Sequence, residues 1–566
     1  MKSFKFLPKF FVQDFWNIGI QTMVSGYYRP LLAASFMLDY AFWHNNPFGY
    51  HLTNLIFHIL VSVLIFFFAE MLSKDKLISF FSALLFSVHP IHTEAVSFVS
   101  GRVDVIAFAF FLLSLILFLK YTLTTKSIFY LFSLLCFFIS LLVKEMAITL
   151  PLVVLCLDFL YISKRNVKSV IRNFMRFHIG FFVVLGLYLL IRFYVIGSSF
   201  IVENVRYASN YLPGTTPHWW FFTVIKIMTF YIRLLFFPYN LKADYLFQAA
   251  NSLFEPAVLL GIIIMLLFLF LAIKNVKKYT ILSFSIIWFF ITILPVSNIF
   301  PQGNIFAERY MYIPSVGFCI AMGFLFSWLL KKDIRMPHLN WKASVFFVFF
   351  LIIIASGRVT FERNRVWNND FTLWYDTAKA VPNSPRAHLN LANAYYKMDF
   401  LDEAMEEVKI ALKLCPSYYE ALDLLGHIYL KKGLVDEAIK IYKIATEMYS
   451  ERATAYNSLA VVYGKKGQYK DSIEAALIAL KKNPYFDDAR YNLALSYRRA
   501  GLIDEAIKAY EEYLRLYPEY PGVHVDVGHL YYKKGEYRKA KAHWLKALKI
   551  SKDYKPAKDA LELIED

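Results

Sequence analysis

The residues best suited to chemistry lie in short polar motifs between long apolar runs. Four cations stand out among them: Arg29, Arg102, Lys144 and Arg309. A charged side chain at membrane depth is costly and therefore marks a functional candidate. Because guanidinium groups bind phosphate through paired hydrogen bonds, we expect these cations to form a cup for a phosphate-bearing ligand near the outer membrane interface.

The motifs also contain groups that accept protons. His89, His92 and Glu94 lie in the sequence His-Pro-Ile-His-Thr-Glu. We expect both histidines to support phosphate binding. A simpler alternative for the cations is that they extend to lipid headgroups and pair with the neighbouring acids. A metal site at these three residues is a weaker alternative, because Pro90 intervenes and no fourth ligand is evident. The sequence thus predicts no metal site and implies no cofactor firmly.

The elements that position these motifs are membrane helices. The chain has 566 residues, of which 58% are hydrophobic and 18% charged, against roughly 45–50% and about 25% in soluble domains. Several of its apolar runs reach the ~20 residues that a bilayer crossing needs. The ten runs are 50–72, 77–96, 102–122, 127–143, 146–162, 177–197, 255–273, 279–298, 312–330 and 342–357.

Charge placement predicts the orientation of these helices. Alternate short connections hold 16 Lys and Arg residues, so this side is predicted to be cytoplasmic. The net charge of +18 therefore belongs mainly to membrane loops, not to a nucleic-acid surface. The opposite side holds the outer segment 1–49, the loops 198–254 and 299–311 and everything after 357, and we expect function there. Within the first of these loops, His218–Pro238 carries Lys226 and Arg233 and is predicted to form an amphipathic or re-entrant helix.

The four cysteines do not add a site. Cys136, Cys156, Cys319 and Cys415 form no Cys-x-x-Cys pair and no cluster, which excludes a zinc site and a disulfide framework.

After a connector over 358–384, the sequence repeats every 34 residues, over 385–418, 419–452, 453–486, 487–520 and 521–554. A tyrosine recurs at the eleventh position and a small residue at the eighth, which is typical of tetratricopeptide repeats. The tail 555–566 is predicted to cap the solenoid. We expect the repeats to bind a protein through a groove that includes one position of each unit: Asn390, Leu424, Ser458, Asn492 and Asp526.

The motifs in their order resemble one known family. Arg-Pro-Leu, Gly-Tyr-His-Leu-Thr-Asn, His-Pro-Ile-His-Thr-Glu-Ala-Val, Gly-Arg-Val-Asp, Lys-Glu and Ala-Glu-Arg-Tyr-Met-Tyr-Ile-Pro-Ser precede the repeats. This string resembles the transmembrane-and-tetratricopeptide-repeat (TMTC) proteins, which belong to the GT-C glycosyltransferases. The resemblance implies an all-α chain with a GT-C-like polytopic membrane domain over 50–357, followed by a tetratricopeptide-repeat α-solenoid.

The resemblance also implies an activity. Eukaryotic members are O-mannosyltransferases that use dolichyl-phosphate mannose, so this chain would move a sugar from a lipid-linked donor to a protein or glycan acceptor outside the cytoplasm. Since the sequence contains no Asn-x-Ser/Thr sequon, we favour a prokaryotic plasma-membrane relative with an undecaprenyl-type carrier. In a eukaryote, the repeats would face the ER lumen.

An inverting sugar transfer needs a carboxylate that takes the acceptor proton and cations that stabilise the departing phosphate. Arg102, Lys144 and Arg309 would stabilise the departing phosphate, with Arg29, His89 and His92 in support. Four further residues would line the outer loops: His51, Glu145, Asp244 and Glu308.

The catalytic base is the point where the sequence departs from the family. The paired acids that follow the family's first helix are missing, and we expect a longer native N-terminus. Otherwise Asp14, Asp104 or Glu94 is the base, or the protein is inactive. Two alternatives remain: a non-catalytic membrane scaffold that recruits partners through its repeats, and a lipid-linked polysaccharide polymerase or ligase.

Overall fold

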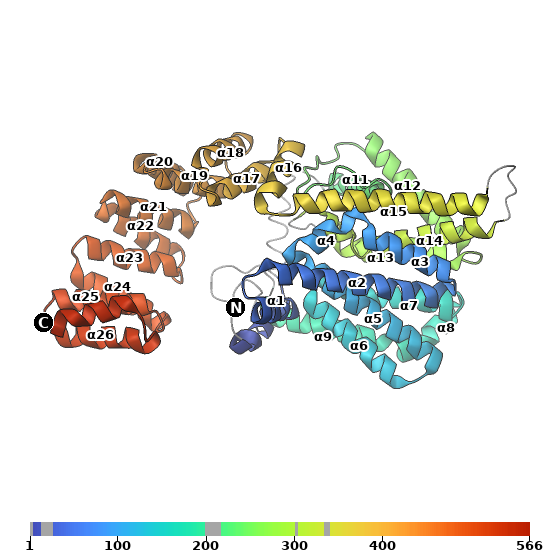
Figure 1. Cartoon of the computed structure of the whole chain (residues 1–566), viewed down its shortest axis with the longest axis horizontal. Helices are drawn as coiled ribbons and strands as arrows, with labels where there is room; N and C mark the ends of the chain where they lie inside the picture. The colour runs from blue at the N-terminus through green and yellow to red at the C-terminus, as the bar shows by residue number, and fades with distance from the viewer. Residues whose placement is uncertain (1–3, 13–26, 198–216, 300–303, 333–339, 566) are drawn as a thin grey trace. The chain divides into compact units, whose positions relative to one another are not determined.

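The computed structural model describes residues 4–12, 27–197, 217–299, 304–332 and 340–565. The chain divides into two compact units, Met1–Val381 and Pro382–Asp566 (Figure 1). Every regular element in the described ranges is helical. The structure therefore confirms the predicted all-α fold.

The first unit consists of helices of very different length. Its α-helices are α1 (Pro30–Trp43), α2 (Pro47–Ser73), α3 (Lys76–Val88), α4 (Thr93–Ser97), α5 (Arg102–Thr124), α6 (Ser127–Val143), α7 (Leu150–Leu157), α8 (Val167–Asn173), α9 (Ile179–Ile196), α11 (Pro217–Phe236), α12 (Pro256–Asn275), α13 (Thr280–Ile293), α14 (Ser315–Lys331), α15 (Trp341–Val366) and α16 (Asp370–Ala380). Short 3-10 or π segments join several of them, including η4 (Glu145–Thr149), η5 (Asp158–Ile162) and η8 (Glu308–Met311).

Each predicted apolar run coincides with one helix or with consecutive helical segments. Six stretches in the described residues are long and apolar enough to cross a membrane: Pro47–Ser73, Val99–Thr124, Glu145–Ile162, Val167–Ile196, Pro256–Asn275 and Trp341–Val366. The other four apolar helices are shorter: Lys76–Val88, Ser127–Val143, Thr280–Val296 and Ser315–Lys331. The chain is thus a membrane protein. Helix α11, which carries Lys226 and Arg233, is outside this set.

Tight turns build helix hairpins. Lys74 adopts a left-handed conformation after α2, and the Asp75 side chain caps α3. Thr125 adopts the same conformation between α5 and α6. Because the α5–α6 hairpin turns at Thr125, the start of α5 and the end of α6 lie together at the opposite end of the two helices. That end carries the polar motifs.

Small residues let the helices pack closely. A Cβ atom added at Gly323 of α14 would lie 2.4 Å from Oγ of Ser82 in α3, and one added at Gly317 would lie 2.3 Å from the Ser285 carbonyl oxygen of α13. Small residues at such contacts are typical of membrane helices, where close van der Waals packing replaces the hydrophobic effect.

Helix α15 continues past residue 357, where the apolar run ends. It reaches Val366, and α16 follows at Asp370. The predicted connector 358–384 is therefore mostly helical. The reason is that charged residues such as Arg358 end an apolar run without ending a helix, since arginine has good helix propensity.

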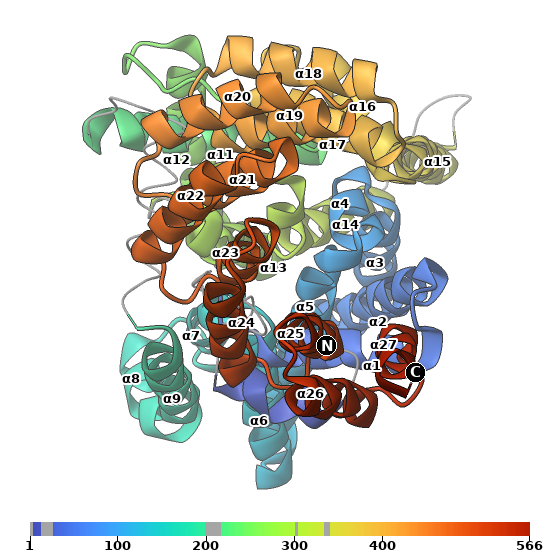
Figure 2. The same cartoon turned by 90° about the vertical axis from the view of Figure 1, so that its left-hand side faces the viewer.

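The second unit is a stack of helix pairs (Figure 2). The pairs are α17 (Pro385–Lys397) with α18 (Leu401–Leu414), α19 (Tyr419–Lys431) with α20 (Val435–Met448), α21 (Ala453–Lys466) with α22 (Tyr469–Lys482), α23 (Asp487–Arg499) with α24 (Ile503–Leu516), and α25 (Pro521–Lys533) with α26 (Tyr537–Ile550). Helix α27 (Lys555–Glu565) packs on the last pair. Each pair occupies one of the 34-residue units.

Candidate functional site

Four ion pairs lie at the ends of the membrane helices that carry the polar motifs. Each joins one of the four predicted cations to a carboxylate that is distant in sequence. The pairs are Arg29 with Glu145, Arg102 with Asp39 and Lys144 with Asp104, each at 2.5 Å, and Arg309 with Glu94. The cations that we expected to form an open cup are therefore each neutralised by an acid in this structure.

Asp104 interacts with the cations of three of these pairs. It follows the first residues of α5, is fully buried, and interacts electrostatically with Arg29, Lys144 and Arg309. The ring of Tyr310 lies beneath two of these cations, with its centroid 5.8 Å from Nζ of Lys144 and 5.2 Å from Cζ of Arg309. We call the group formed by Arg29, Asp104, Lys144, Tyr310 and Arg309 the cation cluster.

Two of the predicted bases, Glu94 and Asp104, differ in how their carboxylate oxygens are bonded. Both carboxylate oxygens of Glu94 are engaged, one by the backbone N–H of Arg309 at 2.9 Å and the other by its guanidinium. In Asp104, Oδ1 accepts from Lys144, whereas Oδ2 is buried without a hydrogen-bond partner in the described part of the chain. Asp14 lies outside the described residues. Of these two predicted bases, Asp104 is therefore the one with a carboxylate oxygen available to accept a proton.

Arg102 belongs to a separate contact. Its guanidinium donates to the carbonyl oxygens of Ser35 (3.4 Å) and Tyr50 (3.1 Å) and lies over the ring of Phe36 at 4.3 Å. Together with the ion pair to Asp39, these bonds join α1, α2 and α5. We did not predict Asp39, although it is the single charged residue of α1, and that isolation is the signal that would have found it.

The two histidines are buried and bonded. His89 Nε2 donates to the Leu235 carbonyl at 3.0 Å, and its Nδ1 accepts from the Ile91 N–H at 3.3 Å. His92 Nδ1 donates to the Phe86 carbonyl at 2.8 Å, and its Nε2 lies 2.8 Å from the Ser315 hydroxyl. These hydrogen bonds hold both imidazole rings in place within the fold. No group of three potential metal ligands converges anywhere in the described ranges.

Glu308 forms a second polar centre. Its Oε1 accepts from the Lys242 backbone N–H and the Tyr245 hydroxyl, both at 2.6 Å, and the Arg363 guanidinium lies 3.8 Å away. Burial raises the pKa of Glu308 to about 7, and the nearby Glu94 adds to the shift while Arg363 opposes it. Tyr245 and Arg363 were not predicted, because nothing local distinguishes them.

The other predicted outer-loop residues lie in different places. Asp244 is half-buried in the segment between Lys242 and Tyr245 that contacts Glu308, Glu145 belongs to the ion pair with Arg29, and His51 is exposed near the start of α2.

An apolar cavity of about 330 Å³ lies near the histidines. It is bounded by α11, α12, α13 and α14. Leu235 and Phe318 line it and also touch His89, through the hydrogen bond to the Leu235 carbonyl and a ring contact with Phe318 at 5.9 Å. We call it the apolar groove. Its other lining residues include Phe268, Phe289, Ala321 and Leu325.

In the second unit, the predicted groove positions join neighbouring repeats. Ser458 donates to Asp423 at 3.2 Å, Asn492 donates to Asn457 at 2.9 Å, and Asp526 pairs with Arg498 at 2.5 Å. Asn390 is half-buried and Leu424 is buried.

Family models for the tetratricopeptide repeat match residues 389–453, 457–521 and 522–554. The solved structure of the tetratricopeptide-repeat protein YrrB aligns with 33% of this chain and 97% of its own at 22% identity, with a TM-score of 0.29.

Curated relatives align with most of the chain. A protein O-mannosyl-transferase of Caenorhabditis elegans is 28% identical over 428 residues, covering 73% of this chain and 57% of the relative. The Homo sapiens protein O-mannosyl-transferase TMTC1 is 26% identical over 470 residues, covering 74% and 51%. The chain spans about half the length of the curated relatives it matches. Together with its membrane helices and its tetratricopeptide repeats, this similarity makes the chain TMTC-like.

Proposed function

We propose that the chain is a GT-C type membrane glycosyltransferase that moves a sugar from a polyprenyl-phosphate donor to an acceptor hydroxyl on the extracytoplasmic face. The observation that carries the proposal is the cation cluster, in which residues from positions 29 to 309 meet around one buried carboxylate. The names of the similar proteins, protein O-mannosyl-transferases, support the same activity.

In this mechanism Asp104 is the general base. Its unpartnered Oδ2 takes the proton of the acceptor hydroxyl as the hydroxyl oxygen bonds to the anomeric carbon of the sugar. The bond from that carbon to the phosphate oxygen breaks, and its electron pair remains on the polyprenyl phosphate. Arg29, Lys144 and Arg309 stabilise the charge on this leaving group. To do so, Arg29 and Arg309 exchange part of their contact with Glu145 and Glu94 for the donor phosphate.

The apolar groove would hold the start of the prenyl chain. Its lining is almost entirely hydrocarbon, and His89 connects it to the segment that carries Glu94. An isoprenoid chain suits this lining because it buries apolar surface against apolar surface and leaves no polar group without a hydrogen-bond partner.

The proposal also includes the orientation of the chain in the membrane, the role of the repeats and the type of lipid carrier. The basic turns would face the cytoplasm, the repeats would lie outside it and bind the acceptor or a partner protein, and the carrier would be of the undecaprenyl type in a prokaryotic plasma membrane. The proposal needs no metal or other cofactor.

The test uses the full chain in lipid nanodiscs with a tritiated mannosyl-phosphoryl-polyprenol and a membrane extract of the host as acceptor. We expect labelled protein or glycan, and a loss of about a hundredfold in rate in the Arg309→Ala variant, the size associated with removing one donor to a developing oxyanion. The exposed Arg358 on α15 provides the matched control Arg358→Ala, which should keep the rate.

Full transfer by the Arg309→Ala variant would contradict the proposal. No transfer by the wild-type chain would instead favour the non-catalytic scaffold alternative, in which changes in the repeats alone abolish function.

A further inference from the structure

The fourth position of several repeats carries the same contact. In repeats 1, 4 and 5 this position is His388, Arg490 and His524, and each side chain donates to the carbonyl oxygen of the proline six residues before it, at 2.9, 2.6 and 3.1 Å. The bond ties the first helix of the unit to the turn that precedes it. A basic side chain is thereby held in one orientation.

In two of these repeats a carboxylate completes the contact. Nδ1 of His388 lies 2.6 Å from Glu407, which occupies position 23 of repeat 1. Arg490 donates to Glu512, at position 26 of repeat 4, at 3.3 Å. In each case the basic group at position 4 faces an oxyanion from the second helix of its own unit.

The last repeat has the basic group without the oxyanion. Position 23 of repeat 5 is His543 and position 26 is Lys546, so both carboxylate positions carry basic side chains. Nδ1 of His524 meets Nδ1 of His543 at 3.1 Å in place of a glutamate. The geometry of repeat 1 is preserved while its negative charge is absent.

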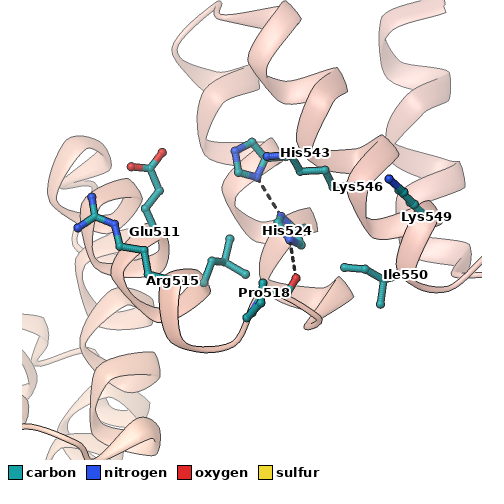
Figure 3. Close-up of a pocket in the computed structure, with 9 residues that line it drawn as sticks. Glu511, Arg515, Pro518, His524, His543, Lys546, Lys549 and Ile550 are labelled. Carbon is teal, nitrogen blue, oxygen red and sulfur yellow. Dashed lines mark hydrogen bonds between the residues drawn. The ribbon is translucent and has the colours of Figure 1, made fainter.

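A cavity of about 470 Å³ opens beside these histidines (Figure 3). Arg515 from α24 and Lys546 and Lys549 from α26 line it, and none of the three forms an ion pair among the described residues. Glu511 is the acid in the lining, and it accepts a hydrogen bond from the Tyr531 hydroxyl at 2.8 Å. Three cations against one acid leave the cavity positively charged.

The hydrogen bonds also orient the imidazoles. Nε2 of His524 donates to the Pro518 carbonyl, so Nδ1 of the neutral ring accepts from the Nδ1–H of His543. Nε2 of His543 then carries a lone pair. Burial, with help from His524 and Lys546, lowers the pKa of His543 to about 4, and Glu511 opposes this shift. An anion in the cavity would favour a proton on His543.

We propose that the cavity formed by His524, His543, Lys546, Lys549 and Arg515 binds an oxyanion, a carboxylate or a phosphate, on an acidic peptide segment of a partner protein. The oxyanion takes the place that Glu407 occupies in repeat 1 and Glu512 in repeat 4. A volume of 470 Å³ admits one or two side chains of such a segment. This site is independent of the transfer chemistry proposed for the membrane unit.

The experiment is fluorescence anisotropy with the full chain in nanodiscs at about 0.15 M salt, where long-range charge attraction is largely screened. Three labelled peptides are compared: hexaglutamate, a phosphoserine peptide and hexaglutamine. We expect the anionic peptides to bind and the glutamine peptide to fail. Preference between the two anionic peptides distinguishes a carboxylate from a phosphate as the preferred group.

Three variants locate the binding. Lys546→Gln should weaken it about tenfold, or about 1.4 kcal/mol. His543→Glu should abolish it, because the new carboxylate satisfies His524 as Glu407 satisfies His388, and its melting temperature should not fall. Lys481→Gln, which removes an exposed lysine at the position in repeat 3 that Lys549 holds in repeat 5, should leave affinity unchanged.

The proposal fails if neither anionic peptide binds to the wild-type chain, or if hexaglutamine binds equally well. It also fails if the Lys546→Gln and His543→Glu variants, with melting curves like the wild type, retain full affinity. Tighter binding at pH 6 than at pH 8 would further support it, because the bound anion favours the protonated form of His543.

Discussion

Nζ of Lys144 lies 2.5 Å from Oδ1 of Asp104, and both side chains are buried. Asp104 stands at the start of α5, whereas Lys144 directly follows α6, so the hairpin brings their ends together. An ion pair in such a place is strongly coupled, because removal of one partner leaves a buried charge without compensation. Lys144 thereby holds the proposed base in position.

We predict that Lys144→Met lowers the free energy of unfolding by about 3 kcal/mol, the cost of an uncompensated buried charge. The double variant Asp104→Asn with Lys144→Met should lose less than the sum of the two single changes. Thermal unfolding in detergent, followed by circular dichroism, measures both. Additive losses would show that the two side chains do not interact. As a control, Lys331→Met removes a pair with Asp75 in which the lysine is 64% exposed, and it should cost less than about 1 kcal/mol.

We predict that Ala321→Trp, which fills the apolar groove, raises KM for a long-chain polyprenyl donor about tenfold and changes KM for a short-chain donor much less. The reason is that the indole occupies space the prenyl chain needs, while the phosphate contacts remain. Leu269→Trp is the control, since Leu269 lies on α12 with 56% of its surface exposed. Equal effects on both donors would place the chain elsewhere.

We predict that stability falls as pH rises through the range in which Glu308 loses its proton. Burial raises its folded pKa from 4.5 to about 7, so the folded state holds the proton more tightly than the unfolded state. The stabilisation is present below about pH 4.5 and lost by about pH 7, with a size on the order of 2–3 kcal/mol. Thermal melts from pH 5 to 8 follow this change.

The neutral variant Glu308→Gln should remove that pH dependence and melt higher than the wild type at pH 8, because its amide oxygen still accepts from Lys242 and Tyr245. Glu362→Gln, at a residue with a 59% exposed side chain, should behave like the wild type. An unchanged slope in the Glu308→Gln variant would assign the dependence to another group.

We predict that Gly528→Ala destabilises the last repeat by about 2 kcal/mol, since overpacking of a tight core typically costs 1–3 kcal/mol. A Cβ atom there would lie 2.1 Å from Nε1 of the buried Trp544. Gly464→Ala in repeat 3 meets nothing nearer than the Ser472 hydroxyl at 3.3 Å and should keep or raise stability, because alanine is the better helix former. Limited proteolysis and thermal melts compare the two.

The helical class, the apolar runs and the repeat register were predictable from the sequence. Each of these is a local or periodic property: a run such as 102–122 is apolar along its whole length, and a glycine recurs at the same position in Gly433, Gly467, Gly501 and Gly535, where the structure shows a positive φ of 75 to 82°. Periodicity and hydropathy are visible in one dimension, so the elements they specify are predictable.

The partners of the charged residues, in contrast, became visible only in the folded chain. The motifs identified Arg29, Arg102, Lys144 and Arg309, but the sequence did not show that each meets a carboxylate between 40 and 215 residues away. Asp39, Tyr245 and Arg363 acquire their roles only through contacts across the fold. The oxyanion missing from repeat 5 likewise emerges only when Glu407 and His543 are seen in equivalent contacts. Electrostatic interactions depend on distances in space, and residues that are far apart in sequence come close together only when the helices pack.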